Sequence, residues 1–229
     1  MLPVITIDGP AGVGKTTTAA LLGRKLCLPR LDTGAMFRYF ALQIGDRINE
    51  MPNDELARFC AQWKFSLAGT GPDTLLLVNG NPVGPEIRSE KVGAMASKLG
   101  TVPAIRDILR KSQQQLGAMT PLVAEGRDLG TVVFPKARFK FFLDASPAVR
   151  AKRRWLELAE KGIQTDFEEL SRQIRQRDEQ DRTRSIAPLM PAKDAVVIDT
   201  SSLTIDEVAC ALETHIKNKG GLQADLSSR

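Results

Sequence analysis

The chain is poor in cysteine, histidine and tyrosine, and these shortages exclude several kinds of site. It has three cysteines, one histidine and one tyrosine in 229 residues. Cys27, Cys60 and Cys210 are odd in number and far apart, so they do not indicate a disulfide framework. With His215 they form no CxxC or Cys/His pattern of a zinc site. A metal ion in this protein would therefore be held by oxygen ligands.

Long hydrophobic runs are also missing. No apolar stretch approaches the roughly 18 residues that a membrane-spanning helix needs. The opening segment 2–7 has no basic flank and is ended by Asp8, so no secretion signal is predicted. A net charge of +5 permits anionic partners without selecting among them. We expect a cytoplasmic protein with no membrane partner.

What the sequence does contain is the composition of an ordinary globular protein. It is 42% hydrophobic and 26% charged, which excludes collagen-like and wholly disordered chains. The length fits one large α/β domain that buries a sizeable core and has room for small insertions.

Short apolar strands alternate with amphipathic helices, a pattern typical of α/β folds. We predict strands at residues 4–7, 30–32, 121–124, 139–144 and 195–199. We predict helices at residues 15–25, 34–44, 54–62 (with Asn53 as N-cap), 86–99, 103–116, 148–161, 167–182 and 204–217. Residues 63–83 break this alternation with a Gly-rich turn and an Asn-Gly pair, which predicts a small inserted antiparallel hairpin.

The first strand leads into a complete phosphate-binding motif, G-x-x-x-x-G-K-[ST], at residues 9–16. Glycines let backbone N–H groups turn toward phosphate oxygens, and the following helix presents its positive end. Lys15, which we expect on an exposed loop, would neutralise β/γ charge, and the Thr16 hydroxyl is the candidate Mg²⁺ ligand. The alternative is an ordinary Gly-rich turn. The expected ATP phosphate-binding residues are Gly9, Pro10, Ala11, Gly12, Val13, Gly14, Lys15, Thr16 and Thr17.

Two further loops follow strands and should emerge at the same sheet edge, where open α/β sheets bind ligands. The run from Asp32 to Arg38 offers an arginine suited to a second phosphate; the alternative is a helix cap at Asp32 or Thr33 with a solvated Arg38. The run 125–131 sets Arg127 beside Asp128 between glycines, which suits one ligand; a surface turn with a local ion pair is the alternative.

Charged residues concentrate on the two helices expected between 146 and 184. Arg177, Asp181 and Arg184 share one helical face or its extension, since they are spaced at i, i+4 and i+7. A solvated, salt-bridged helix would have the same pattern. The cationic cluster on the preceding helix suggests a mobile lid that clamps phosphate. The cluster consists of Arg150, Lys152, Arg153 and Arg154, and we predict Arg150, Arg153 and Arg154 as the lid residues.

Over residues 3–218 the sequence closely resembles bacterial cytidylate kinases. The resemblance is carried by the segments 5–15, 31–38, 126–135, 177–184 and 187–189. It implies a P-loop kinase three-layer fold with a parallel five-stranded sheet, an inserted antiparallel β/helical monophosphate-binding subdomain and a helical lid. It also implies an ATP-dependent kinase that uses Mg²⁺ and converts CMP or dCMP into CDP or dCDP.

The resemblance implies a role for individual residues of the acceptor site. Ser97, Arg106 and Asp128 match the positions that recognise cytosine; Arg38, Arg127 and Arg184 match phosphate contacts, and Arg177 and Asp181 match ribose contacts. Thr33 stands where many members have serine, and Glu125 stands where others often have aspartate and receives no role. Lys15, Arg127 and Arg184 are the expected catalytic residues.

The domain organisation expected from this resemblance is a single domain with two mobile parts. We predict a core at 1–62, 101–145 and 185–218, a monophosphate-binding insert at 63–100, a lid at 146–184 and a frayed tail at 219–229. We expect a monomer that does not bind nucleic acid. Two alternatives remain: a P-loop kinase with another acceptor, such as UMP or shikimate, and a P-loop switch or nucleic-acid-stimulated ATPase. The second lacks support because the chain has no N-K-x-D guanine motif and no aromatic stripe among its basic residues.

Overall fold

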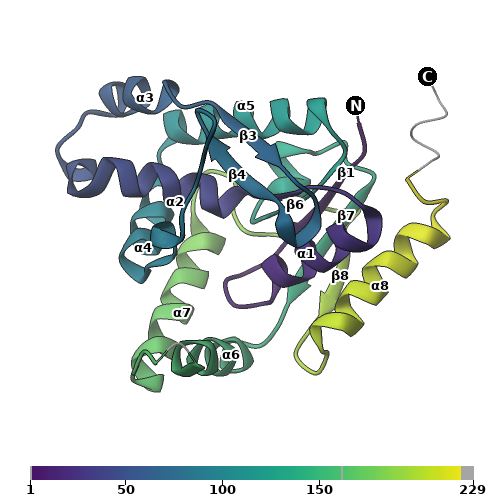
Figure 1. Ribbon diagram of the computed structural model, residues 1–229. Coiled ribbons are helices and arrows are strands. Elements are labelled where there is room, and N and C mark those ends of the chain that lie inside the picture. Colours follow the sequence, from purple (N-terminus) through teal and green to yellow (C-terminus); the bar gives the residue numbers. More distant parts are fainter. Residues whose placement is uncertain (1, 161, 223–229) are drawn as a thin grey trace.

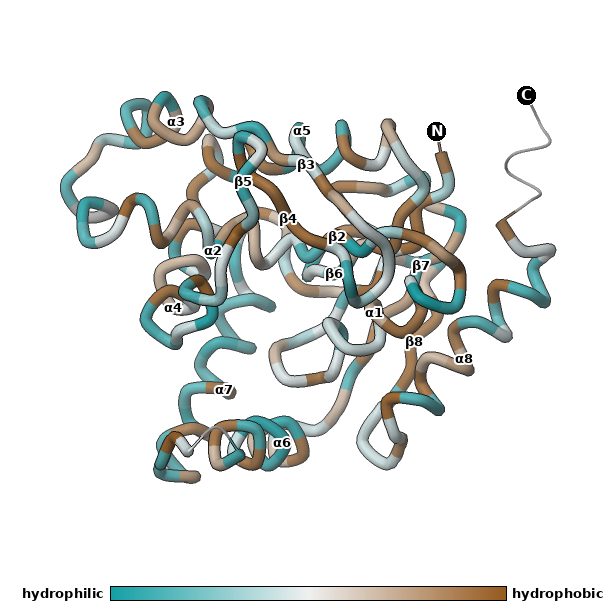
Figure 2. The backbone as a smooth tube through the Cα atoms, viewed as in Figure 1, coloured by the Kyte–Doolittle hydropathy of each residue, from teal (hydrophilic) through white to brown (hydrophobic). Residues whose placement is uncertain are grey.

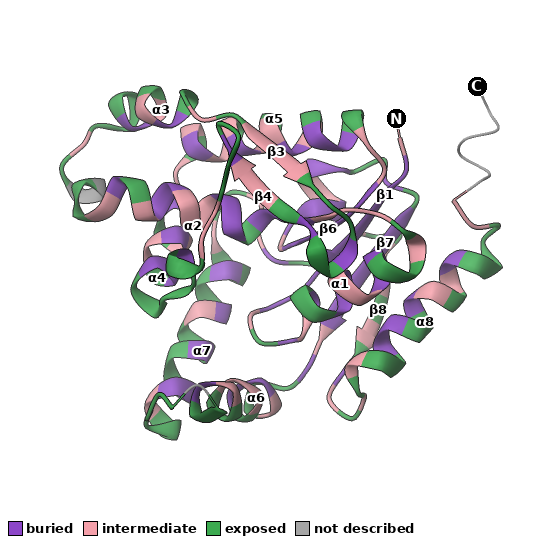
Figure 3. Ribbon diagram, in the orientation of Figure 1, coloured by how far each residue is buried: buried purple, intermediate pink, exposed green. Residues whose placement is uncertain are grey.

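A computed structural model describes residues 2–160 and 162–222 of the chain. At its centre lies a parallel five-stranded sheet in the order β2-β6-β1-β7-β8, drawn in Figure 1. The strands are β1 (Val4–Asp8), β2 (Arg30–Asp32), β6 (Leu122–Gly126), β7 (Phe139–Asp144) and β8 (Val196–Asp199). The central strand β1 is buried along its whole length, as its apolar, β-branched sequence requires. Figure 3 shows the same burial along the middle of the sheet.

Helices cover both faces of this sheet. They are α1 (Lys15–Leu26), α2 (Thr33–Ile44), α3 (Asn53–Ala61), α4 (Glu90–Leu99), α5 (Pro103–Met119), α6 (Pro147–Glu160), α7 (Phe167–Thr183) and α8 (Ile205–Asn218). Alternate residues of β1 enter different apolar cores: Val4 packs with α2 and α5, whereas Ile5 and Ile7 pack with α1 and α8. This arrangement confirms the predicted three-layer α/β fold with a parallel five-stranded sheet.

A second, smaller sheet lies in the region predicted as an inserted hairpin. Strands β3 (Phe65–Ala68), β4 (Leu75–Val78) and β5 (Asn81–Pro82) pair antiparallel. Asn79 and Gly80 turn the chain with positive φ angles of 50° and 83°, the conformation that favours Asn-Gly in tight hairpins. The hairpin is confirmed, and the short third strand β5 extends it.

Helices α6 and α7 pack side by side and project from the sheet, as Figure 1 shows. A small apolar cluster of Ala151, Leu158, Leu170 and Ile174 joins them. Much of α7 is hydrophilic in Figure 2, in contrast to the strands. This pair therefore has only a small core of its own, as a movable element requires.

Several element boundaries differ from the sequence predictions. The N-cap of α3 is Pro52, without a side-chain hydrogen bond, so the predicted Asn53 cap is wrong: Asn53 is already helical. The helix predicted at 86–99 is divided into a 3₁₀ turn, Pro85–Arg88, and α4, because the Ser89 side chain accepts a hydrogen bond from Val92 N and starts a new helix.

Two other differences concern the ends of elements. Strand β6 continues through Gly126, so Glu125 is a strand residue and not a loop residue, and a π-helical turn at Leu129–Val133 follows. Lys161, the predicted last residue of a helix, and residues 223–229 of the predicted frayed tail lie outside the described residues. Within the described part of the chain, no helix is long and apolar enough to span a membrane.

Candidate active site

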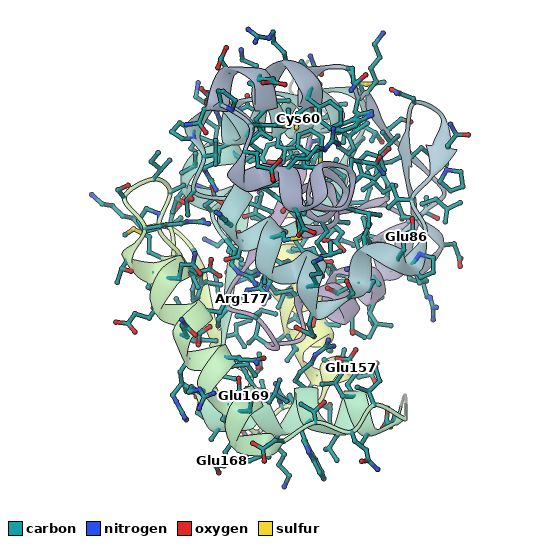
Figure 4. The ribbon with its side chains drawn as sticks, turned by 90° about the vertical axis from the view of Figure 1, so that its left-hand side faces the viewer. Cys60, Glu86, Glu157, Glu168, Glu169 and Arg177 are labelled. Atoms are coloured by element: carbon teal, nitrogen blue, oxygen red, sulfur yellow. The ribbon has the colours of Figure 1, made fainter. Side chains whose placement is uncertain are left out.

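The carboxyl ends of β1, β2 and β6 meet at one edge of the sheet and open into a cleft of about 1000 Å³. It extends beneath the α6–α7 pair. Most of the site residues predicted from the sequence line this cleft: Ala11, Gly12, Gly14, Lys15, Thr16, Thr17, Thr33, Arg38, Ser97, Arg106, Arg127, Asp128, Arg153, Arg154, Arg177, Asp181 and Arg184. Gly9, Pro10, Val13 and Arg150 are not among its lining residues. Figure 4 shows Arg177 on the part of α7 that is nearer to the core, Glu157 on α6, and Glu168 and Glu169 further out on α7.

The phosphate-binding loop connects β1 to the start of α1. Gly9 adopts φ 148°, and a Cβ there would lie 2.1 Å from the carbonyl oxygen of Leu143, so a side chain does not fit. Gly14 has φ 93° and precedes Lys15, the first residue of α1. The loop therefore directs the helix N-terminus into the cleft, an anion-binding geometry.

Lys15 is buried and not exposed as the sequence suggested. Its Nζ donates a hydrogen bond to the carbonyl oxygen of Pro10 at 2.6 Å, within the phosphate-binding loop itself. Burial and the nearby Arg127 lower the pKa of Lys15 well below its usual range. The ammonium is thus held inside the loop that would surround the phosphates.

Glu125 is a site residue that the sequence left without a role. Its buried Oε2 accepts a hydrogen bond from Thr16 Oγ1 at 2.8 Å, and its Oε1 pairs with Arg30 at 2.9 Å. Burial, together with the charge of Asp32, raises the pKa of Glu125 to about 7. The sequence did carry a signal for this role, because an acidic residue directly follows the predicted strand 121–124. In the structure Glu125 pairs with Ile7 of β1. Its backbone oxygen also accepts from Thr33 Oγ1 at 2.7 Å.

Arginines and aspartates from three parts of the chain meet at the other end of the cleft. Arg106 of α5 pairs with Asp128, which follows β6, and Arg184 Nη2 lies 3.4 Å from the second oxygen of Asp128. Arg127 Nε donates to Asp181 of α7 at 3.1 Å. Asp181 is 5% exposed, and although burial opposes its ionisation, Arg127 lowers its pKa. These buried pairs rule out a solvated, salt-bridged helix face.

Two donors in this pocket have no hydrogen-bond partner among the described residues. They are the buried Ser97 Oγ and Arg177 Nε. Burial, followed by Arg127, lowers the pKa of Arg177 to about 10. Arg38 is engaged, because its Nη1 donates to the carbonyl oxygens of Ile87 and Ser89. Unpaired buried polar groups are rare in proteins, so Ser97 and Arg177 are suited to bind a ligand.

The three predicted lid cations differ in position. Arg150 is 1% exposed, pairs with Asp178 and donates to the carbonyl oxygen of Ala11 at 3.0 Å. It contacts the back of the phosphate-binding loop because it lies in the first turn of α6. Arg153 lines the cleft and donates to Thr200, and Arg154 lines it and pairs with Glu90 of α4.

The described residues contain no cluster of three acidic, cysteine or histidine side chains that could hold a metal ion by themselves. The fit to Mg²⁺ is nevertheless good. Proteins commonly bind this ion through one or two oxygen groups, with nucleotide phosphates and water completing the coordination. Thr16, with its hydroxyl beside the Glu125 carboxylate at the start of α1, meets that requirement.

Phosphate-binding backbone at one end of the cleft and paired arginines at the other suit the transfer of a phosphoryl group between two phosphates, which is the arrangement of a P-loop kinase. A crystal structure of an uncharacterised protein from Eubacterium ventriosum shares the fold, with a TM-score of 0.53 and 11% identity over 95% of this chain and 99% of that one. The family model described as cytidylate kinase matches residues 5–218, and the chain belongs to this family.

Curated relatives are similar over nearly the whole chain. The chain is 49% identical to the cytidylate kinase of Oleidesulfovibrio alaskensis over 214 residues, which cover 93% of this chain and 98% of the relative. It is 51% identical to the cytidylate kinase of Lawsonia intracellularis over 205 residues, which cover 90% of this chain and 91% of the relative. The predicted family is confirmed.

Proposed function

We propose that this protein transfers the γ-phosphoryl group of ATP to CMP or dCMP, with ADP and CDP or dCDP as products. The observation that carries the proposal is the Arg106–Asp128 pair, in the same cleft as the phosphate-binding loop and with Ser97 Oγ, which has no hydrogen-bond partner among the described residues. The names of the relatives, which cover at least nine-tenths of the chain, support the same acceptor.

The acceptor base is recognised by a donor and an acceptor on one edge. The Asp128 carboxylate accepts a hydrogen bond from the exocyclic amine of cytosine, while Arg106 donates to N3 or O2. Uracil carries a carbonyl oxygen in place of that amine, and this oxygen would face the carboxylate. A buried carboxylate that faces an acceptor instead of a donor lowers the binding affinity, so the Arg106–Asp128 pair favours CMP over UMP.

Arg177 and Asp181 bind the ribose, and Arg38, Arg127 and Arg184 bind the acceptor phosphate. Within the protein, Arg38 donates to backbone carbonyl oxygens, and Arg127 and Arg184 pair with aspartates. In the proposed complex, substrate oxygens become the partners of these guanidinium groups. A planar guanidinium suits the bidentate recognition of phosphate.

Catalysis depends on alignment and charge because phosphoryl transfer needs no protein nucleophile. The loop amides and Lys15 hold the donor phosphates, and Arg127 and Arg184 stabilise negative charge between the two substrates. Thr16, supported by Glu125, is the protein group that would hold Mg²⁺, which neutralises the β- and γ-phosphates when bound. Arg153 and Arg154 reach the donor phosphates when the lid closes, and Arg150 supports the loop from behind.

Two segments move over the fixed sheet in this mechanism, the insert at 63–100 and the lid at 146–184. They already meet through the ion pair between Arg154 of α6 and Glu90 of α4. Their closure excludes water, which would otherwise hydrolyse ATP. The cytoplasmic location, the monomeric state and the lack of a nucleic-acid partner stay predictions.

A coupled assay of ADP release with AMP, CMP, dCMP, UMP, GMP and dTMP tests this function. We expect turnover with CMP and dCMP well above that with the other nucleotides, and dependence on Mg²⁺. Equal turnover with UMP, or ATP hydrolysis that no monophosphate stimulates, would contradict the proposal.

A further inference from the structure

Phe37 is the only aromatic side chain among the described residues that line the cleft. It lies on α2 one turn after Thr33, is half-buried, and packs against the apolar core beneath that helix. The other large apolar residues that line the cleft in the described part of the chain lie elsewhere: Leu170 and Ile174 join α6 to α7, Leu203 packs on the core between α1 and α8, and Ile205 lies against the phosphate-binding loop at Gly14. The acceptor end of the cleft therefore has one extended apolar face.

This face lies beside the groups that recognise the base. The Cζ atom of Arg106 is 5.9 Å from the centroid of the Phe37 ring, within the range of a cation–π contact. The same guanidinium is fixed by Asp128 and by the carbonyl oxygen of Gly100, which it contacts at 3.2 Å. Arg106 and Phe37 therefore have a defined position relative to each other.

We propose that Phe37 supplies the aromatic face against which the pyrimidine ring of the acceptor packs while Arg106 and Asp128 bind its edge. This inference rests on the proposed function. Hydrogen bonds to the edge of a base leave its two π-faces uncovered, and nucleobases gain affinity when such a face packs on an aromatic ring. The remaining groups at this end of the cleft are charged, small or polar, so none of them offers a comparable surface.

Packing on a ring does not distinguish cytosine from uracil, because both have a similar π-face. Phe37 therefore contributes affinity for the base in general, and Asp128 contributes the choice between bases. The two residues make different contributions to the same binding event, and these can be separated by experiment.

The test measures the dissociation constants of CMP, UMP and ribose 5-phosphate with the full chain and its variants. Phe37→Leu should weaken CMP and UMP by a similar factor, roughly tenfold or more, because the ring face is lost. Ribose 5-phosphate has no base, so its dissociation constant for Phe37→Leu should equal that for the wild type. Phe37→Tyr keeps the ring and should stay close to wild-type affinity for all three.

Tyr39→Leu is the matched control. Tyr39 lies on the same helix but packs on Trp63 and Phe65, at 5.5 and 6.3 Å between ring centroids, and does not line the cleft. The Tyr39→Leu substitution removes an aromatic ring from α2 outside the acceptor pocket, so the affinity for CMP should not change. If Phe37→Leu does not fold, Phe37→Met, whose longer and flexible side chain adapts to the same space, carries the same expectation.

Wild-type CMP affinity in the folded leucine or methionine variant would overturn the inference. An equal loss of ribose 5-phosphate binding would also overturn it, because the effect would then not involve the base. A wild-type protein that binds neither CMP nor UMP would overturn the proposed function instead, so the two failures are distinguishable.

Discussion

Each aspartate of the acceptor pocket is shared by two arginines. Asp128 contacts Arg106 and Arg184, and Asp181 contacts Arg127 at 3.1 Å and Arg184 at 3.8 Å. Arg184 therefore keeps one aspartate when the other is lost, whereas Arg106 loses its partner with Asp128 and Arg127 loses its partner with Asp181. The consequence for activity depends on whether the missing group faced the base or the sugar.

Asp128→Asn and Asp181→Ala should separate these roles. Asparagine offers both a donor and an acceptor, so the preference for CMP over UMP should fall by roughly 1 to 3 kcal/mol, the typical size of one base-edge contact. Asp181→Ala should weaken both nucleotides together and leave their ratio nearly unchanged. The measurement is kcat/KM for CMP and UMP in each variant. If Asp128→Asn lowers kcat/KM equally for CMP and UMP, Asp128 only supports the structure of its loop.

Lys15→Ala should lower kcat by roughly a hundredfold or more, by analogy with the loss of one preorganised donor that stabilises charge. The variant should remain folded, with a loss in the free energy of unfolding of at most about 1 to 3 kcal/mol from the hydrogen bond to Pro10. Lys25→Ala is the matched control, since Lys25 lies on the same helix and pairs with Glu213 at the surface. Near-normal turnover in Lys15→Ala would remove the loop lysine from the mechanism.

At the scale of secondary-structure elements, the segments around the cleft differ in how firmly they are held. Strands β1, β6 and β7 are almost entirely buried in the sheet, whereas α6 and α7 share only a small cluster of apolar residues. Arg150 pairs with Asp178 and so joins α6 to α7 at their base. Arg150 also donates to Ala11, and Arg182 pairs with Asp144, so both helices are tied to the rest of the molecule there. Motion of the pair about this base would leave the sheet unchanged.

Hydrogen exchange should show this difference. Addition of CMP with a non-hydrolysable ATP analogue should slow exchange in residues 63–100 and 146–184, because the insert and the lid close over both ligands. Exchange in β1, β6 and β7 should change little, and this is the internal control. Identical exchange with and without ligands, at concentrations that saturate binding, would contradict a closing enzyme.

At the scale of the whole molecule, one buried carboxylate connects the sheet to the acceptor loop. Asp8, at the end of β1, accepts hydrogen bonds from the backbone N–H groups of Leu129 and Gly130 at 2.9 and 2.8 Å. It therefore holds the π-helical turn that follows Asp128. Burial raises its pKa to about 6, although these two hydrogen bonds oppose the shift.

This pKa makes stability depend on pH. The folded chain binds the Asp8 proton more tightly than the unfolded chain, so the contribution of Asp8 to the free energy of unfolding falls as pH rises from about 3.8 to about 6, and then levels off. Asp8→Asn should remove that decline and cost roughly 1 to 3 kcal/mol, since an amide cannot accept both hydrogen bonds through two oxygens. Urea unfolding between pH 4.5 and 7.5 measures this, and parallel pH profiles for the variant and the wild type would contradict it.

Much of the fold was predictable because its signals are local. Apolar β-branched runs marked the strands, and the Asn79-Gly80 pair marked the hairpin. Boundaries were less predictable: Asn53 has the chemistry of an N-cap, yet Pro52, with its fixed φ, already occupies that position before the first helical turn. Capping depends on the backbone conformation of one residue, which composition does not determine.

The phosphate-binding loop could be located without a structure, because its function resides in contiguous backbone between β1 and α1, and a complete motif specifies such a segment locally. The sequence also indicated that Arg127 and Asp128 would face the cleft, since residues at the carboxyl ends of parallel strands share one edge. The roles of Arg106, Arg177 and Asp181 were expected only from the family resemblance, because these residues lie on helices. Only the tertiary structure decided what these side chains contact. Glu125 lies 109 positions from Thr16 and Arg150 lies 139 positions from Ala11, so no local pattern could join them. The burial of Lys15, the pairing of Arg106 with Asp128 and the position of Phe37 beside them likewise depend on several elements packing together, because the space and the charge around a side chain come from residues that are distant along the chain.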